Sequence, residues 1–458
     1  MKKARKESDS IGVLEVPENA YYGVQTLRGY NNFRITGVKM HPSFIKSITM
    51  IKKAAAKVNG KYGYIKAEVA DAIIRACDEV LEDKFKEEFI TDAVQGGAGT
   101  TVNMNVNEVL ANRATELLGG KKGEYLCHPN DHVNCSQSTN DVIPTAGKMT
   151  VLKLSFFLDA YLDGLITALE MKAEEFDDVI KMGRTQLQDA VPIRLGQEFR
   201  AYASALKRDS KRIKKALEEM RVVNIGGTAI GTSINVGEEY LANIVEELSK
   251  ECKQELKHAD DLIDATQNLD SFVALSGALK VCAVNLSKMC NDLRLMSSGP
   301  KAGLGEITLP AKQNGSSIMP GKVNPVIPEV VSQVAFLVIG NDMTITMAAE
   351  AGQLELNAFE PVIFYKLFES ITCLTNAMDT LIVNCISGLQ VNRERCAELL
   401  YSSVGMVTAL CPYLGYKKCA EIAKEALKKN VSVKEVVLQD GLMDEETLDK
   451  ILDPYAMT

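Results

Sequence analysis

The chain has 458 residues, a formal net charge of -8 at pH 7 and 46% apolar residues. This apolar content, with 24% charged residues, is typical of a folded globular protein and excludes disordered, collagen-like and membrane-embedded chains as whole-chain classes. The acidic balance argues against a nucleic-acid partner, because such a partner needs a basic face. One hydrophobic core rarely serves more than ~250–300 residues, so we expect more than one domain.

Cysteine usage and the N-terminus indicate where the protein resides. Eleven cysteines are scattered along the chain, and none are spaced C-x-x-C. We therefore expect reduced thiols packed among apolar side chains, not a disulfide framework or a zinc site. The basic N-terminus is followed by no apolar run, and no stretch of ~18 apolar residues occurs. We expect no signal peptide, no membrane contact and a cytoplasmic location.

The predicted elements change in length along the chain. The first part combines short extended pieces at 13–16 and 21–24 with helices at about 43–59, 66–82 and 103–118. Long intervals without proline follow, and these permit long helices because an interior proline costs a helix ~3 kcal/mol. Apolar residues at helical spacing predict long helices over 151–169, 194–222, 265–293, 326–350 and 358–391. Short amphipathic helices come after about residue 392.

These elements predict a mainly α fold with three domains. We expect a mixed, mostly helical N-terminal domain at 1–136, a central long-helix bundle at 137–391 and a small helical C-terminal domain at 392–458. A helix of ~30 residues is ~45 Å long, so five such helices favour an elongated bundle. Their apolar faces exceed what one chain can bury, which predicts a homo-oligomer.

The segment GSSIMPGKVNP at 315–325 is the densest cluster of glycine and small polar residues. It contains Ser316, Ser317, Lys322 and Asn324, and an Asn-Pro pair predicts that a helix starts there, with asparagine as its N-cap. A loop that enters a helix N-terminus beside a lysine can bind an anion. The alternative is an ordinary Gly/Pro loop before a helix.

Three other segments place hydroxyl and amide groups before or between long helices. They are GGAGTTVNMN at 96–105, SQSTND at 136–141 and GRTQLQDAVP at 183–192. Each segment alone is typical of helix capping. Together they favour a site in which neutral donors hold carboxylate oxygens. The candidate residues in these segments are Thr100, Ser138, Thr139, Asn140, Thr185 and Gln186.

The four segments, in this order, resemble the active-site regions of the aspartase/fumarase superfamily of lyases, and GSSIMPGKVNP closely resembles its signature loop. The resemblance runs from about residue 11 to the C-terminal helices. Within the superfamily, GAGT, QSTND, LQDAVP and GQLELN are similar to the aspartase branch and differ from fumarases. The resemblance implies a mainly helical homotetramer around a central bundle, with active sites built from segments of three subunits.

The resemblance also implies a reaction and a role for each candidate residue. The reaction is the reversible deamination of L-aspartate to fumarate and ammonia, by removal of a Cβ proton and anti elimination through an enediolate. Ser316 would be the base; Thr100, Ser138, Thr139 and Ser317 would hold the β-carboxylate; Thr185, Lys322 and Asn324 would hold the α-carboxylate; and Asn140 would face the amino group, with Gln186 nearby. No cofactor or metal ligand is implied for the chemistry, and activation by a divalent cation such as Mg²⁺, as in some relatives, stays open.

Gln186 bears on the alternative functions. Many relatives, fumarases especially, have histidine at this position. Hydroxide needs a proton donor to leave, because water has a pKa of ~15.7, whereas an ammonium group leaves as neutral ammonia. Gln186 thus favours deamination over a fumarate hydratase, which is the second hypothesis. The third is a catalytically inactive helical scaffold of the same fold, and the presence of all the candidate residues together argues against it.

Overall fold

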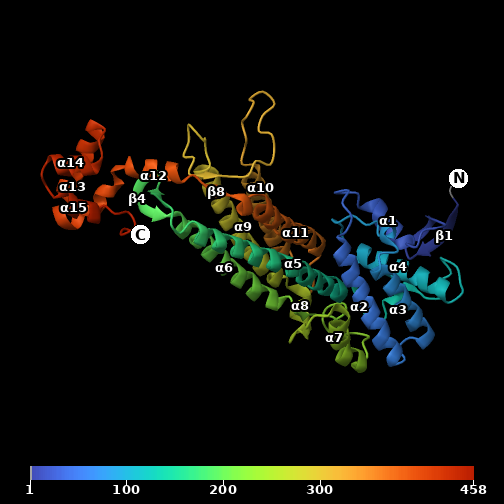
Figure 1. The fold of residues 1–458 in the computed structure, drawn as a ribbon. Coiled ribbons are helices and arrows are strands. Elements are labelled where there is room, and N and C mark those ends of the chain that lie inside the picture. Colours follow the sequence, from blue (N-terminus) through green and yellow to red (C-terminus); the bar gives the residue numbers. More distant parts are fainter. Residues whose placement is uncertain (1–2) are drawn as a thin grey trace. The chain divides into compact units, whose positions relative to one another are not determined.

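The computed structural model describes residues 3–458, and its mainly helical architecture confirms the predicted fold class (Figure 1). The chain forms two compact units, each assembled from three stretches of sequence. Unit 1 comprises Met1–Leu158, Lys211–Val281 and Leu337–Leu374, and unit 2 comprises Asp159–Ser210, Cys282–Phe336 and Thr375–Thr458. The three-domain division at residues 136 and 391 stays a prediction, and Met1 and Lys2 lie outside the described residues.

Five long helices contribute residues to both units, and each corresponds to a predicted helix. They are α5 (Thr139–Glu175), α6 (Leu195–Glu219), α9 (Asp270–Met296), α10 (Val326–Glu350) and α11 (Glu360–Asn384). The helix predicted to reach residue 391 ends at Asn384. The helix predicted from residue 265 is interrupted after α8 (Leu262–Gln267), because Asn268 has an extended backbone.

The core of unit 1 contains a cluster of phenylalanine rings. Phe44, Phe272, Phe364 and Phe368 come from α2, α9 and α11, with ring centroids 5.2–5.8 Å apart. Residues that are far apart in the chain thus share one core.

The other elements of unit 1 are β1 (Ala4–Asp9) paired antiparallel with β2 (Gly12–Pro17), α1 (Val24–Asn32), α2 (Pro42–Lys61), α3 (Ala67–Leu81), η1 (Lys86–Glu88), α4 (Thr100–Leu117), η2 (Pro129–Val133), β5 (Val222–Val223) paired parallel with β6 (Lys257–His258), and α7 (Glu238–Cys252).

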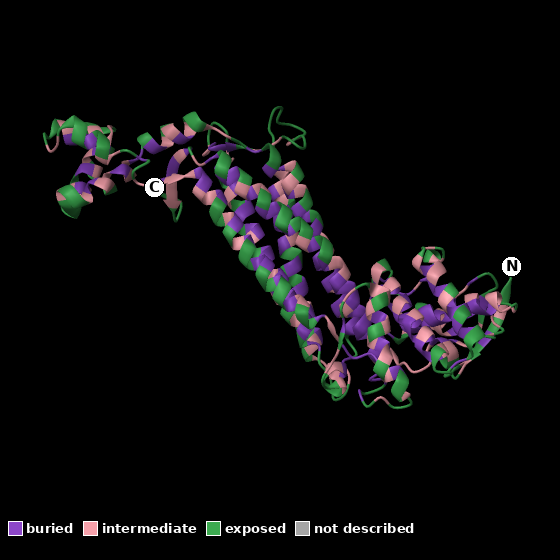
Figure 2. Cartoon of the chain, turned by 60° about the horizontal axis from the view of Figure 1, so that its bottom comes forward, coloured by how far each residue is buried: buried purple, intermediate pink, exposed green. Residues whose placement is uncertain are grey.

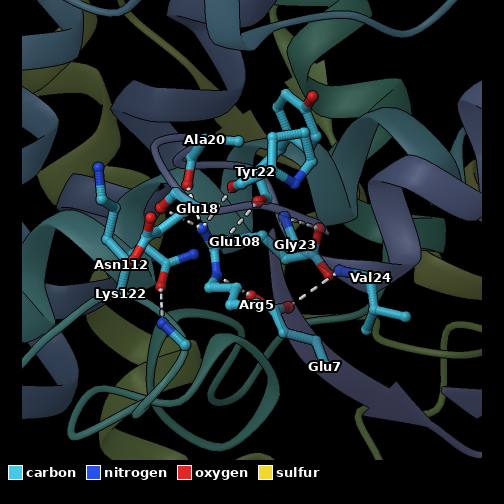
Figure 3. Close-up of polar contacts among 12 residues, drawn as sticks. Arg5, Glu7, Glu18, Ala20, Tyr22, Gly23, Val24, Glu108, Asn112 and Lys122 are labelled. Atoms are coloured by element: carbon cyan, nitrogen blue, oxygen red, sulfur yellow. Dashed lines mark hydrogen bonds and ion pairs between the residues drawn. The ribbon is translucent and has the colours of Figure 1, made fainter. Parts of the chain in front are cut away.

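The extended piece predicted at 21–24 is wrong at its end, because helix α1 begins at Val24. The first N–H groups of a helix have no partner within the helix. Here, two buried carboxylates accept hydrogen bonds from them (Figure 3). Glu7 accepts from Val24 at 3.0 Å, and Glu108 accepts from Gly23 at 2.8 Å and from Thr26 at 3.0 Å. These partners lie far away in sequence, so local patterns could not indicate this helix start.

Unit 2 contains the hairpin of β3 (Ile180–Thr185) and β4 (Gln188–Arg194) and the short antiparallel pair β7 (Ile307–Thr308) and β8 (Gln390–Val391). Its C-terminal part buries an apolar cluster that includes Leu410, Ile422, Val436 and Leu448. The hairpin was not predicted. The remaining elements are η3 (Ile386–Gly388), α12 (Arg393–Tyr401), η4 (Val404–Leu410), α13 (Cys411–Lys429), α14 (Val433–Gln439) and α15 (Glu445–Ile451).

Exposed residues occur along the long helices (Figure 2), and some of them are apolar. On α10, Phe336 is 62%, Met343 63% and Met347 65% exposed. By length and composition, α9 and α10 could each cross a membrane, although 50% and 39% of their most apolar windows are buried in the structure. A core helix of a soluble protein has the same length and composition, and exposed apolar patches of this kind mark contact surfaces.

We predict opposite effects of alanine at two glycines of α5. A Cβ atom on Gly147 would lie 2.5 Å from the buried ring of Phe364, whereas one on Gly164 would lie 3.6 Å from Ile382. Gly147→Ala should lower the free energy of unfolding by ~1–3 kcal/mol through overpacking. Gly164→Ala should raise it by ~0.5–1 kcal/mol, because alanine restricts the unfolded chain. Urea unfolding of both variants measures the difference, and equal effects would contradict the packing described here.

Candidate functional site

In unit 1, helix α4 begins directly after an unusual turn. Gly97, Ala98 and Gly99 all have left-handed backbones, with φ of 83°, 53° and 84°. The side chain of Ile143 lies 3.0 Å from where a Cβ atom on Gly99 would be, so glycine is required there for space as well as conformation. The turn places Thr100 at the first position of α4, where its hydroxyl donates to the Gly97 carbonyl at 2.8 Å.

The N-termini of α4 and α5 are joined by a buried amide network. Asn103, on the first turn of α4, donates through Nδ2 to the hydroxyl oxygen of Thr139 at 3.2 Å. The oxygen of Asn134 accepts from Asn103 at 3.2 Å, from Asn107 at 3.1 Å and from the ammonium group of Lys52 at 2.8 Å. These bonds hold the α4 turn beside the start of α5.

A buried carboxylate fixes the start of α5. Asp141 accepts from the backbone N–H groups of Ser138 at 2.9 Å and of Gly226 and Thr228 at 3.0 Å each. Burial raises the pKa of Asp141 to about 6, although these bonds and the charge of Lys52 act in the opposite direction. Burial also lowers the pKa of Lys52 to about 7. Asp141 and Lys52 have opposite charges when ionised, so each offsets the charge of the other in the buried region next to the segment at 136–141.

Ser138 and Asn140 are half-buried at this helix start. The Ser138 oxygen accepts from the backbone N–H of Asn140 at 3.3 Å, and the Asn140 side chain donates to the carbonyl of Ala229 at 2.7 Å. Because the amide nitrogen of Asn140 is engaged in this way, its amide oxygen is the part available to a ligand that donates hydrogen bonds.

In unit 2, Thr185 and Gln186 lie at the exposed tip of the β3–β4 hairpin. The two turn residues, Gln186 and Leu187, have φ of 53° and 62°. Turns of this kind favour glycine and asparagine, and other residues cost ~1–2 kcal/mol each in the left-handed region. The tip also borders a cavity of about 390 Å³ whose lining includes Gln186, Glu198, Tyr202 and Asp292. Backbone strain of this size is more frequent at functional sites than elsewhere.

The 315–325 loop closes on itself. The N–H of Gly315 donates to the carbonyl of Lys322 at 2.9 Å, and a Cβ atom on Gly315 would lie 2.2 Å from that carbonyl oxygen. The predicted capping role of Asn324 is wrong: its side chain donates to the Gly315 carbonyl at 2.9 Å, and the helix begins at Val326. Asn324 therefore closes the loop. Ser317 and Lys322 are exposed.

Ser316 has the surroundings that a serine base needs. Its hydroxyl oxygen accepts from the backbone N–H groups of Ile318 at 3.2 Å and Met319 at 3.1 Å. Donors aimed at one oxygen stabilise negative charge on it and thus favour the alkoxide. The side chain is half-buried within the loop.

A buried ion cluster ties the hairpin to the segment that leads into this loop. The carboxylate of Glu306 is fully buried and contacts Arg184 at 2.8 Å and Lys181 at 3.3 Å, both on β3. The backbone of Glu306 is held as well, because its N–H donates to Met296 at 2.9 Å and its carbonyl accepts from Asn392 at 2.8 Å. Glu306 thus fixes β3, whose last residue is Thr185.

The structure brings one set of candidate residues together. Thr100, Ser138, Thr139 and Asn140 lie at two joined helix starts in unit 1. In unit 2, Thr185 and Gln186 lie on the hairpin, and Ser316, Ser317, Lys322 and Asn324 lie on the loop, without a hydrogen bond between hairpin tip and loop among the described residues. Local sequence patterns did not indicate the supporting residues Lys52, Asn134, Asp141, Arg184 and Glu306. A lysine on the apolar stripe of the helix predicted at 43–59 was the one available signal, because the other partners lie far apart in sequence.

Comparisons with known proteins identify the family context of these segments. A family model described as Lyase matches residues 12–340, and one described as Fumarase C C-terminus matches residues 406–458. An aspartate ammonia-lyase from Bacillus sp is 51% identical over 455 residues, with 99% of this chain and 97% of the relative covered.

Two solved structures have the same fold. A fumarate lyase:delta crystallin from Brucella melitensis bound to cobalt superposes with a TM-score of 0.96 at 50% identity, covering 99% of both chains. A class II fumarase from Schistosoma mansoni superposes with a TM-score of 0.95 at 37% identity, covering 99% of this chain and 98% of the fumarase.

We predict that Glu306→Gln is strongly destabilising. The change removes the carboxylate that Arg184 contacts at 2.8 Å, while Lys181 keeps Glu198 at 2.9 Å, and breaking a buried ion pair in this way costs ~3–5 kcal/mol. We expect the free energy of unfolding in urea to fall by this amount and amide hydrogen exchange to rise along β3. The matched control is Asp178→Asn, which removes an exposed ion pair with Arg393 in the same unit and should cost less than ~1 kcal/mol. Similar losses in both variants would show that burial of Glu306 has no special effect.

Proposed function

The chain belongs to the aspartase/fumarase superfamily of lyases, and we propose that it removes ammonia from L-aspartate to leave fumarate, with Ser316 as the base. It is a carbon–nitrogen lyase whose full-length relatives, 50–53% identical, are aspartate ammonia-lyases. The observation that carries the role of Ser316 is the pair of N–H donors on its oxygen.

Two observations favour deamination over the hydration of fumarate. Identity is 51% to an aspartate ammonia-lyase and 37% to a class II fumarase, over nearly the whole chain in both cases. In addition, Gln186 cannot donate a full proton, which a leaving hydroxide requires. Ammonia leaves without such a donor. A hairpin tip that carries Gln186 is therefore better suited to cleavage of a carbon–nitrogen bond than of a carbon–oxygen bond.

The difficult step is removal of a proton next to a carboxylate, because the electrons left behind place a second negative charge on that carboxylate. Donors already directed at this charge lower the barrier, and loss of one typically costs ~2.7–4 kcal/mol. We assign this role to Thr100, Ser138, Thr139 and Ser317. The starts of α4 and α5 add the partial positive charge of helix N-termini.

The remaining candidates would hold and orient the rest of the substrate. We assign the α-carboxylate to Thr185, Lys322 and Asn324, where exposed Lys322 supplies a full charge. The amide oxygen of Asn140 would accept from the amino group, because its nitrogen is bonded to Ala229. Gln186 would lie close to the same group.

The proposed assembly is a cytoplasmic homotetramer with composite active sites and no nucleic-acid or membrane partner. Two features support composite sites. The exposed apolar face of α10 requires cover. The candidate residues are also divided between the two compact units, with Ser138 in unit 1 and Thr185 in unit 2.

We predict that the purified protein forms fumarate from L-aspartate and not from L-malate, as followed by ultraviolet absorbance. Ser316→Ala should lower kcat by at least ~10²–10⁴-fold, because the base is lost, while the oligomer persists in size-exclusion chromatography. Ser402→Ala, at an exposed serine in the same unit, is the control and should retain activity. Fumarate from malate alone would reject the ammonia-lyase function, no fumarate from either would favour a scaffold, and near-normal turnover by Ser316→Ala would reject its role.

Composite sites predict complementation between two inactive variants. Thr100→Val and Ser316→Ala should each be inactive alone, whereas mixed oligomers refolded together should regain activity, because some sites then receive intact residues from different chains. Each variant refolded alone is the control. If mixed oligomers form and remain inactive, both residues of one site come from the same chain.

A further inference from the structure

Two cysteines in the C-terminal part of unit 2 lie close to each other. All eleven cysteines are free, and burial together with the neighbouring Cys411 thiol raises the pKa of Cys419 to about 11. Both side chains belong to the same apolar packing around Ile422 and Val436. The proposed reaction uses neither thiol, so the pair calls for a separate explanation.

Helix α13 is broken between the two residues. On an uninterrupted helix, residues eight positions apart are ~12 Å apart along the axis. Gly415 has φ 77° and ψ 155°, which interrupts the helix midway. Only glycine adopts this conformation easily, although the space around its Cα is open. The kink therefore removes the spacing of a straight helix, and both side chains pack in the same cluster.

The two thiols differ in access to solvent. Cys419 is 2% exposed, whereas Cys411 is half-buried at the edge of the cluster. Burial raises the pKa of Cys419 as it raises those of other buried cysteines such as Cys282 and Cys396, so these thiols stay protonated and do not meet an oxidant first. Cys411 therefore combines access to a small oxidant with a second thiol nearby, and the second thiol is required only after Cys411 has been oxidised.

We propose that Cys411 and Cys419 form a reversible disulfide when the protein meets hydrogen peroxide. The Cys411 sulfur attacks one peroxide oxygen, the O–O bond breaks, and a sulfenic acid and one water result. The Cys419 sulfur then attacks the sulfenic sulfur and releases the second water. In total, two thiols lose two electrons and two protons, and the peroxide is reduced to two waters. A dithiol reductant reverses the change by thiol–disulfide exchange.

The cysteine pair directly follows a segment, η4, that packs on the β3–β4 hairpin. Cys411 directly follows η4, in which Gly405 packs so closely on β4 that a Cβ atom would lie 2.4 Å from the Ala190 carbonyl oxygen. Met406 of the same segment contacts Met182 of β3. The disulfide would thus fix the kink at the end of the segment that supports the hairpin.

The test uses the reduced full-length protein, treated with hydrogen peroxide and then with a thiol-alkylating reagent. Trypsin cuts after Arg395, Lys417 and Lys418, so the disulfide would join the peptide 396–417 to the peptide 419–424. The first peptide also carries Cys396, and fragment ions in tandem mass spectrometry distinguish a link through Cys411 from one through Cys396. We expect the linked peptides to appear first, with two fewer alkylated thiols, and to separate again with dithiothreitol. A different cysteine pair linked first, or Cys411 overoxidised without a link, would overturn the proposal.

Three variants serve as controls. Cys419→Ser should leave Cys411 as a sulfenic acid that a dione reagent traps, and Cys411→Ser should abolish the link while keeping the fold, because this side chain is at the edge of the cluster. Cys373→Ser, at another half-buried cysteine, should leave the link unchanged. The assignment is supported if Cys373→Ser forms the linked peptides in normal yield and Cys411→Ser forms none. It is contradicted if peroxide still removes two alkylatable thiols from Cys411→Ser.

Discussion

The chemistry of this lyase depends on one electrostatic constraint: a carboxylate that is already negative must accept a second charge when its neighbouring carbon loses a proton. A protein can meet this demand with oriented neutral donors, which stabilise new charge without first binding the substrate too tightly. The candidate site has such groups in the hydroxyls of Thr100, Ser138 and Thr139, two of which stand at the first position of a helix. The same principle would apply to Ser316, the proposed base, since two backbone N–H groups donate to its hydroxyl oxygen.

Donors that must be directed accurately need rigid support, and in both units this support is a buried charge. Asp141 gathers three backbone N–H groups at the start of α5, and Glu306 holds two cations of β3. Buried ion pairs contribute little net stability, because desolvation offsets their attraction. Asp141 and Glu306 instead fix geometry, because each has partners in several segments. If one partner moved away, a charge would be left unpaired in the interior.

The long helices were predictable because their signals are local. Apolar residues at helical spacing predicted α10 at 326–350 with the bounds that the structure has, and Pro328 lies in the first turn, where a helix tolerates proline. The start of α1 was not predictable, because Glu7 and Glu108 complete it from other elements. The β3–β4 turn lacks glycine and asparagine, so nothing local indicated a hairpin. For Asn324, the sequence identified the residue but not its bond, since the acceptor is a loop carbonyl nine positions earlier.

The same distinction explains why candidate site residues are easier to propose from sequence than their supports. The candidate residues lie in short motifs, because a small diacid would be held by a few donors at the ends of elements. Supporting groups such as Asn134 and Glu306 act through partners on other elements, and each has the pattern of an ordinary polar residue in the sequence. The proposed homotetramer follows the same reasoning, because no local pattern states which chain supplies a segment. The apolar side chains exposed on α10, such as Phe336 and Met347, are the local feature that favours association with other copies.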